Sequence, residues 1–170
     1  MNKYIYIILV CTLALTACHR TKPQSPANRS SKQPDSVAIA LVMMNQRLAE
    51  EADNEVLKYV QANEPDSFVM GSSGYWYRRT IKTDNQKIEK TTQLDMHIVI
   101  YSIEGDMYLD SRESLKPDDP SLLFPVMETL TYMHLGESAE LLIPWYAGYG
   151  NIGKANIPPY TNLRVTIETN

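Results

Sequence analysis

Cysteine is the scarcest reactive side chain in this sequence of 170 residues, which contains only Cys11 and Cys18. Residues 19–170 therefore have no thiol, which excludes a disulfide, a thiolate nucleophile and a cysteine-ligated metal from that part of the chain. Histidine is nearly as scarce. The chain has three, at His19, His97 and His134. No two of them have the spacing of metal ligands, so the sequence predicts neither a metal site nor a cofactor.

Basic patches and common catalytic motifs are also missing. The net charge is -4, and Arg78 and Arg79 are the only adjacent basic residues, so nucleic acid is not expected as a partner. No G-x-S-x-G motif is present, and "GYGNIG" (148–153) lacks the Lys-Ser/Thr ending of a phosphate loop. Asp118 and Asp119 are not followed by the acidic series of a calcium loop. The sequence thus offers no nucleophile and no evident acid–base pair.

The N-terminus has the pattern of a targeting segment. A lysine precedes an apolar run over residues 4–17, which is shorter than the ~20 residues of a membrane-spanning helix. The run ends in Leu-Thr-Ala-Cys (15–18), which resembles the bacterial lipobox. We predict that residues 1–17 are a lipoprotein signal peptide and that Cys18 is lipidated, anchoring the chain to a bacterial envelope membrane and facing the periplasm. An ordinary secretory signal with an incidental cysteine is the alternative.

Two segments separate this anchor from the folded domain. Residues 18–35 contain the lipidated cysteine and then prolines without large apolar side chains, which predicts a flexible tether. Residues 36–64 form a long amphipathic helix, because apolar residues recur at helical spacing. These are Val37, Leu41, Met44, Leu48 and Ala52. The apolar face would pack against the folded domain or against a second subunit.

Residues 67–170 have the pattern of an antiparallel α+β domain. Alternation of Leu94, Met96, Ile98 and Ile100 with polar neighbours is typical of a half-buried strand. Further strands are predicted over residues 74–81, 107–111, 138–144 and 162–168. A short helix begins at Pro125 and ends at Gly136. Glu137 and Glu140, next to a strand start, are expected to be exposed.

The stretch "WYAGYGNIGKANIPPY" (145–160) is unusual in composition. It contains three of the seven glycines, the Pro158-Pro159 pair and four aromatic residues. An aromatic loop over a sheet suits an apolar ligand with few hydrogen-bonding groups. Proline is such a ligand, since it brings no backbone N–H that must be satisfied.

The residues around this stretch resemble the C-terminal half of an FKBP-type peptidyl-prolyl cis-trans isomerase domain. Gly136, Tyr149-Gly150, Ile157-Pro158-Pro159 and Leu163 match the family in order and approximate spacing. Leu109-Asp110-Ser111 resembles the end of its Phe-Asp-Ser strand. The likeness covers roughly residues 70–168 and implies an FKBP-like antiparallel sheet wrapped around a short helix. With the lipobox and the long helix, the chain most resembles the gliding-motility-associated lipoprotein branch.

The resemblance implies a peptidyl-prolyl cis-trans isomerase that assists the folding of Pro-containing client polypeptides in the envelope. It assigns catalytic roles to Tyr149 through its hydroxyl, to Ile157 through its backbone N–H, and to Asp110. The substrate pocket would be lined by Leu109, Leu123, Val126, Ile98, Val165 and Tyr101. A packing role for Tyr149 and a turn-capping role for Asp110 are the alternatives.

The sequence departs from the family at several pocket positions. The usual floor tryptophan falls on Val126, the strand aromatic on Leu109, and two further aromatics on Ile98 and Val165. These changes predict an aliphatic pocket. They leave two other hypotheses open: an FKBP-like chaperone or binding module with little turnover, and a structural component of an envelope assembly that self-associates through the N-terminal helix.

Overall fold

The computed structural model describes residues 36–170. The predicted signal peptide (1–17), the lipidated Cys18 and the tether (18–35) lie outside the described residues. Residues Ala40–Asn170 form one compact unit. Among the described helices, none combines the length and the apolar character needed to cross a membrane.

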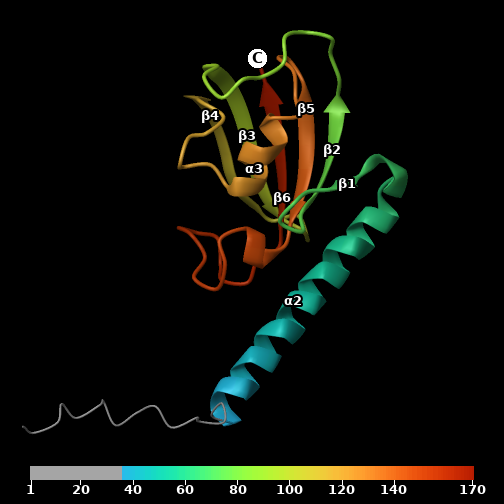
Figure 1. Cartoon of the computed structure of the whole chain (residues 1–170), viewed down its shortest axis with the longest axis vertical. Coiled ribbons are helices and arrows are strands. Elements are labelled where there is room, and N and C mark those ends of the chain that lie inside the picture. Colours follow the sequence, from blue (N-terminus) through green and yellow to red (C-terminus); the bar gives the residue numbers. More distant parts are fainter. Residues whose placement is uncertain (1–35) are drawn as a thin grey trace, which may run out of the picture. The chain divides into compact units, whose positions relative to one another are not determined.

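Six strands form one antiparallel sheet, as the alternating pattern predicts (Figure 1). They are β1 (Val69–Met70), β2 (Trp76–Ile81), β3 (Leu94–Ser102), β4 (Met107–Leu115), β5 (Ser138–Ile143) and β6 (Leu163–Thr169). The order in the sheet is β1-β2-β5-β6-β3-β4, so β6 pairs with β5 on one side and β3 on the other. The two-residue β1 has no counterpart in the sequence prediction, and β4 runs four residues further than the predicted strand.

The core lies between the sheet and one short helix, α3 (Phe124–Leu130), which covers one face of the sheet in Figure 1. Leu94, Met96, Ile98 and Ile100 of β3 are buried, as their two-residue period predicts. They pack in one cluster with Val126 and Leu130 of α3. Pro125 occupies the first turn of α3, where its missing N–H costs no hydrogen bond. The α+β architecture expected from the sequence, an antiparallel sheet packed on a short helix, is therefore present.

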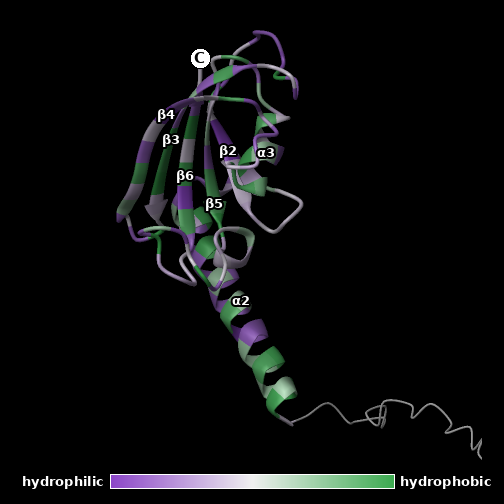
Figure 2. Cartoon of the chain, turned by 90° about the vertical axis from the view of Figure 1, so that its left-hand side faces the viewer, coloured by the Kyte–Doolittle hydropathy of each residue, from purple (hydrophilic) through white to green (hydrophobic). Residues whose placement is uncertain are grey.

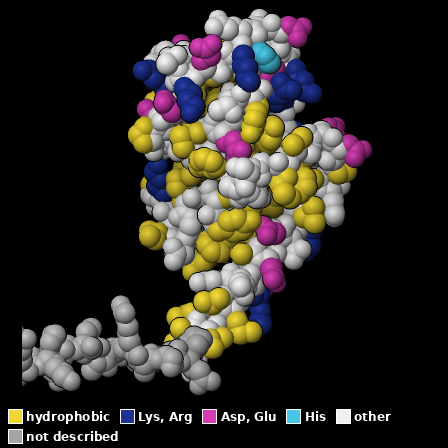
Figure 3. Space-filling view, in the orientation of Figure 1, with side chains coloured by type: hydrophobic (Ala, Val, Ile, Leu, Met, Phe, Trp, Pro, Cys, Tyr) yellow, Lys and Arg dark blue, Asp and Glu magenta, His cyan; other side chains and the backbone are white. Residues whose placement is uncertain are grey.

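The long helix α2 (Ser36–Ala62) has two different halves. In its C-terminal half Ala52, Val56 and Val60 are buried, and the two valines pack with Phe68 and Leu142. Toward its N-terminus the apolar side chains are exposed, including Leu41 and Met44 at 52% and 51%. Figure 2 shows hydrophobic residues along these first turns, and Figure 3 shows them at the surface. The predicted packing on the domain thus holds only for the C-terminal half.

The first residues of the aromatic stretch fasten α2 to the domain. Trp145 and Tyr146 begin a short 3-10 helix, η3 (Trp145–Ala147). The indole Nε1 of Trp145 donates to the carbonyl of Leu48 at 3.3 Å, and the Tyr146 hydroxyl donates to Asp53. Asn162 donates in the same way to Glu55. These residues are therefore structural, and only the later part of the stretch remains for a site.

Glu137 and Glu140 are buried, which corrects the expectation that they are exposed. Glu137 accepts hydrogen bonds from the backbone N–H groups of His134 (3.0 Å) and Thr83 (3.1 Å), and Arg79 lies 3.3 Å away. Glu140 pairs with Arg78 at 2.8 Å. The prediction failed because the arginines belong to β2, which becomes the neighbour of β5 only in the folded sheet. Each buried carboxylate thus has the partners that a buried charge needs.

Candidate functional site

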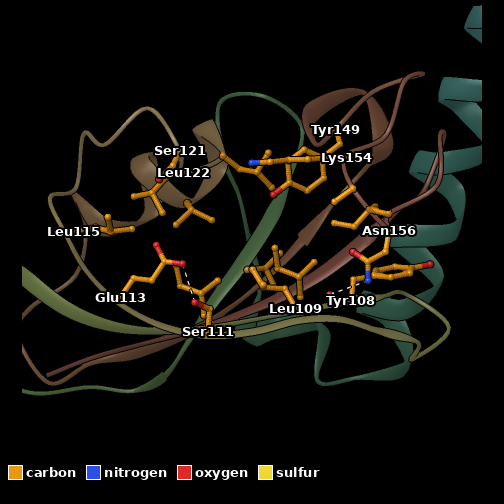
Figure 4. Close-up of a pocket in the computed structure, with 17 residues that line it drawn as sticks. Tyr108, Leu109, Ser111, Glu113, Leu115, Ser121, Leu122, Tyr149, Lys154 and Asn156 are labelled. Atoms are coloured by element: carbon orange, nitrogen blue, oxygen red, sulfur yellow. Dashed lines mark hydrogen bonds between the residues drawn. The ribbon is translucent and has the colours of Figure 1, made fainter.

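A cavity of about 270 Å³ opens between α3, the β3–β4–β6 side of the sheet and the loop that follows η3 (Figure 4). Its deepest wall is aliphatic and buried. The residues of this wall are Ile98, Ile100, Val126, Ile157 and Val165. Among residues 36–170, two aromatic side chains line the cavity, Tyr108 and Tyr149. We call the five residues of the aliphatic wall the floor of the cavity. The floor is a buried aliphatic surface that suits a small apolar ring.

The rim of the cavity carries the polar groups, and these lie in two places. Figure 4 shows Glu113 and Ser111 on the side of Leu115, and Lys154 and Asn156 on the side of Tyr149 and Tyr108. Glu113 accepts a hydrogen bond from the Ser111 hydroxyl at 2.8 Å. Asn156 donates to the carbonyl of Tyr108 at 3.1 Å, which ties the loop to β4. The cavity thus has an apolar floor and a rim with one carboxylate and one ammonium group.

Tyr149 provides a hydrogen-bond donor at this rim. Its ring is half-buried against the core, and burial raises the pKa of its hydroxyl above the ordinary value, so the group keeps its proton at neutral pH. Within residues 36–170 no hydrogen-bond partner satisfies this hydroxyl, although Lys154 Nζ lies 5.1 Å from the ring centroid. A half-buried donor without a protein acceptor is suited to a ligand carbonyl.

A tight turn shapes the wall below Tyr149. Lys154 N–H donates to the Ile157 carbonyl at 3.1 Å, and Ile157 N–H donates back to the Lys154 carbonyl at 2.9 Å. Gly153 enters the turn with φ +75°, and a Cβ there would lie 2.3 Å from the Ile157 carbonyl oxygen. Only glycine fits this position. The Ile157 side chain therefore lines the cavity, and its N–H is bonded to the Lys154 carbonyl within the turn.

Most of the residues that the resemblance places in the pocket meet at this cavity. They are Ile98, Leu109, Leu123, Val126, Tyr149, Ile157 and Val165. Tyr101 does not line it and instead lies beneath the Arg164 guanidinium, 4.4 Å from the ring centroid.

Asp110 also lies outside the cavity. It pairs in register with Val99, whereas Leu109 and Ser111 pair with Ile100 and Ile98 on the cavity side. Because strand side chains alternate, Asp110 points to the opposite face of the sheet. There its carboxylate lies 2.7 Å from His97 Nε2, and Glu168 lies 3.4 Å from His97 Nδ1. The hydrogen bond to Asp110, followed by that to Glu168, raises the pKa of His97. The structure thus gives no place at the cavity to the Asp110 carboxylate.

Several cavity residues were missed by sequence reasoning. Ser111, Glu113 and Leu115 continue the two-residue period that begins at Leu109. Glu113 and Leu115 were missed because the predicted strand ended at Ser111. Lys154 and Asn156 lie inside the aromatic stretch (145–160), but their spacing does not identify them as cavity residues. The backbone N–H of Leu123, just before α3, makes no hydrogen bond within the described residues. In residues 36–170 no cluster of potential metal ligands occurs.

Comparisons with known proteins bear on the fold. No protein-family model matches the chain, and no curated protein matches it. A crystal structure of a peptidyl-prolyl cis-trans isomerase from Pseudomonas syringae pv. tomato is similar, with a TM-score of 0.61 and 17% identity over 73% of this chain and 92% of that one. AtFKBP13 is similar with a TM-score of 0.55 and 18% identity, over 60% and 95% of the two chains.

FkpA from Escherichia coli is similar over 99% of this chain and 81% of its own, with a TM-score of 0.56 and 16% identity. Together with the sheet order and the helix beneath it, these likenesses show that the fold is that of the FKBP-type peptidyl-prolyl isomerases. At such low identity they establish the fold alone.

Proposed function

We propose that this chain is a peptidyl-prolyl cis-trans isomerase acting at the cavity between α3 and the sheet. The observation that carries the proposal is the pairing of a buried aliphatic floor with the Tyr149 hydroxyl, which has no acceptor within the described residues. The fold points the same way. A proline ring would occupy the floor formed by Val126, Ile157 and Val165.

The reaction needs no nucleophile and no proton transfer. Rotation about an X-Pro amide is opposed by ~18–20 kcal/mol because twisting the bond breaks its resonance. The twisted amide is less charge-separated than the planar one, so an apolar wall favours the transition state over the ground state. The site therefore works by differential binding alone.

Two donors would hold the substrate backbone while the bond turns. The Tyr149 hydroxyl donates to the carbonyl of the residue before proline. The Leu123 N–H, for which residues 36–170 provide no acceptor, donates to the carbonyl on the other side of the ring. Fixing both ends keeps the rotation confined to one bond.

The test is catalysis of cis–trans exchange in a short X-Pro peptide by the purified full-length chain, kept in detergent because of its apolar N-terminus. Two-dimensional exchange NMR measures the rate directly. We expect acceleration that Tyr149→Phe weakens and that Tyr101→Phe, outside the cavity, leaves unchanged. No acceleration by a folded sample, over several residues before proline, would overturn the proposal.

A binding module with little turnover is the second candidate function. It is favoured by the aliphatic lining, to which the described part of the chain contributes two aromatic side chains, Tyr108 and Tyr149. A smaller aromatic surface would bind the proline ring less tightly in the transition state, when the X-Pro amide is twisted. Peptide binding without acceleration of exchange would support this candidate.

We also propose a location and an assembly for the protein. A lipid on Cys18 would anchor it in the bacterial envelope, facing the periplasm, where Pro-containing polypeptides would be its clients. The assignment to the gliding-motility-associated lipoprotein branch belongs to the same proposal. Mass spectrometry of the membrane fraction would detect the acylated cysteine, and Cys18→Ser would release the protein from the membrane.

Self-association through α2 completes the proposal. No charged residue occurs between Ser36 and Gln46, and the apolar side chains there are exposed in a single chain. A helix that is apolar all round is normally buried, and a second copy of the same helix offers a matching surface. Light scattering of the full chain should give a dimer, and Leu41→Lys with Met44→Lys should give a monomer.

A further inference from the structure

The cavity rim contains a positive charge whose position suggests a substrate preference. Lys154 lies in the tight turn that ends at Ile157, and its backbone is held there by two hydrogen bonds. Its side chain extends along the Tyr149 ring, with Nζ 5.1 Å from the ring centroid (Figure 4). The ammonium group is therefore held over the ring of the residue whose hydroxyl is proposed to bind the substrate.

This ammonium group is not used by the fold. Within residues 36–170 no carboxylate lies within ion-pair distance of Lys154 Nζ, and the contact with Tyr149 is the interaction that positions it. Several other basic side chains of the domain do have carboxylate partners, such as Arg78 and Arg79. A positioned but unpaired charge at a cavity rim is available to a ligand of opposite sign.

We infer that Lys154 makes the cavity selective for peptides with an acidic residue immediately before proline. The inference rests on the proposed function, because it assumes that the Tyr149 hydroxyl binds the carbonyl of that preceding residue. The side chain of the same residue then projects toward the rim beside Tyr149, where Lys154 stands. An aspartate or glutamate there would pair with the ammonium group.

The carboxylate of Glu113, the second charge of the rim, limits the preference for acidic residues to the Tyr149 end of the cavity. Glu113 lies with Ser111 and Leu115, apart from the Tyr149 end of the cavity in Figure 4. Its carboxylate would repel an acidic residue bound at that end and would accept a basic one. The two charges together give a peptide one preferred direction across the floor.

The expected effect is modest because the rim is open to water. Exposed ion pairs change binding by about two- to fivefold, and salt screens them. We therefore expect a peptide with Glu-Pro to exceed its Gln-Pro counterpart by about two- to fivefold in kcat/KM at low ionic strength. Gln matches Glu in shape, so the ratio isolates the charge. The ratio should fall toward one in 0.5 M salt, a concentration at which the screening length is only about 4 Å.

The experiment compares Glu-Pro, Gln-Pro and Lys-Pro peptides with the full-length chain and with Lys154→Gln and Lys154→Glu. Lys154→Gln should abolish the preference, and Lys154→Glu should reverse it in favour of Lys-Pro. Lys82→Gln removes an exposed lysine outside the cavity lining and should leave the ratio intact. Circular dichroism checks that every variant is folded.

The outcomes separate this inference from the proposed function. Turnover of all peptides with an unchanged Glu/Gln ratio in Lys154→Glu would overturn the inference and leave the isomerase in place. If no peptide is turned over, the same ratio is measured as Kd by NMR titration. A Glu preference that Lys154→Glu reverses would then support the inference in a binding module, and equal affinities or no binding would overturn it.

Discussion

Two glutamates of this domain, Glu137 and Glu113, show how differently the fold treats its polar groups. Glu137 is fully buried at the start of β5 and has three partners, the N–H groups of His134 and Thr83 and the Arg79 side chain. Glu113 is exposed at the cavity rim and accepts one hydrogen bond from Ser111. The first holds strands together, whereas the second leaves most of its hydrogen-bonding capacity to solvent or a ligand.

The same contrast separates the two regions around them. The buried Glu137 carboxylate is matched by Arg79 and by two backbone N–H groups, which is what burial of a charge requires. At the cavity, the Tyr149 hydroxyl, the Lys154 ammonium and the Leu123 N–H have no partner of opposite polarity within the described residues. Unused polar groups around an apolar floor are thus the feature that distinguishes a binding surface from the rest of the fold.

The largest expected effect on stability comes from removing the buried carboxylate of Glu137. Glu137→Ala removes the acceptor of two partly buried N–H groups and the partner of Arg79, so we expect the free energy of unfolding to fall by about 3 kcal/mol at pH 7. The control is Glu113→Ala, which removes an exposed glutamate and should change the free energy of unfolding by less than about 0.5 kcal/mol. Urea denaturation followed by circular dichroism measures both, and equal losses would contradict the contrast.

Backbone geometry in the cavity wall gives the next effect. Gly153→Ala places a Cβ against the Ile157 carbonyl and should cost about 2 kcal/mol of stability as the turn is displaced. Gly150 has a similar φ of +69°, but nothing lies within 4 Å of a Cβ there. Gly150→Ala should therefore cost only about 1 kcal/mol. Thermal unfolding of the two variants tests whether the clash, rather than φ alone, constrains the wall.

Removing one unmatched donor should affect turnover more than stability. We expect Tyr149→Phe to lower kcat/KM about tenfold, the loss of one hydrogen bond that is made in the transition state. Its unfolding free energy should stay within about 0.5 kcal/mol, because residues 36–170 give the hydroxyl no acceptor. Activity should also be flat from pH 7 to 9, since burial raises the pKa of this phenol above its usual range. Parallel losses of stability and activity would instead mark Tyr149 as a packing residue.

The smallest effect concerns a set that is paired but exposed, His97 with Asp110 and Glu168. The hydrogen bonds to these carboxylates raise the pKa of His97 in the folded state. A raised pKa stabilises the fold fully below the unfolded value near 6.5 and loses that contribution as the pH rises through the folded value. The parent should therefore exceed His97→Gln in free energy of unfolding at pH 5.5, and this difference should shrink as the pH is raised to 8.5. A gap that is constant with pH would show that the imidazole charge contributes nothing.

Sequence reasoning succeeded where the signal is local and repeated. The period-two pattern of β3 identified its buried face, and the order of glycine, tyrosine and proline residues after β5 identified the fold. Two residues of that segment, Tyr149 and Ile157, line the cavity. It failed where a property depends on a distant strand. The burial of Glu137 requires Arg79 from β2, and the outward direction of Asp110 follows from its register with Val99.

The helix α2 shows the same limit. Its apolar spacing predicted a packed face along its whole length, but the contacts that bury Ala52 and Val56 end before Leu41. Nothing in the spacing marks that point. The aromatic stretch likewise divides between fastening α2 through Trp145 and lining the cavity through Tyr149, which composition cannot separate.

The position of β6 has a consequence for how the protein is made. Residues 163–169 are the last strand along the chain, yet they lie between β5 and β3 and bridge the two halves of the sheet. A nascent chain can therefore close neither half of its core until these residues have been synthesised. Folding of the sheet must therefore wait until synthesis of the domain is nearly finished.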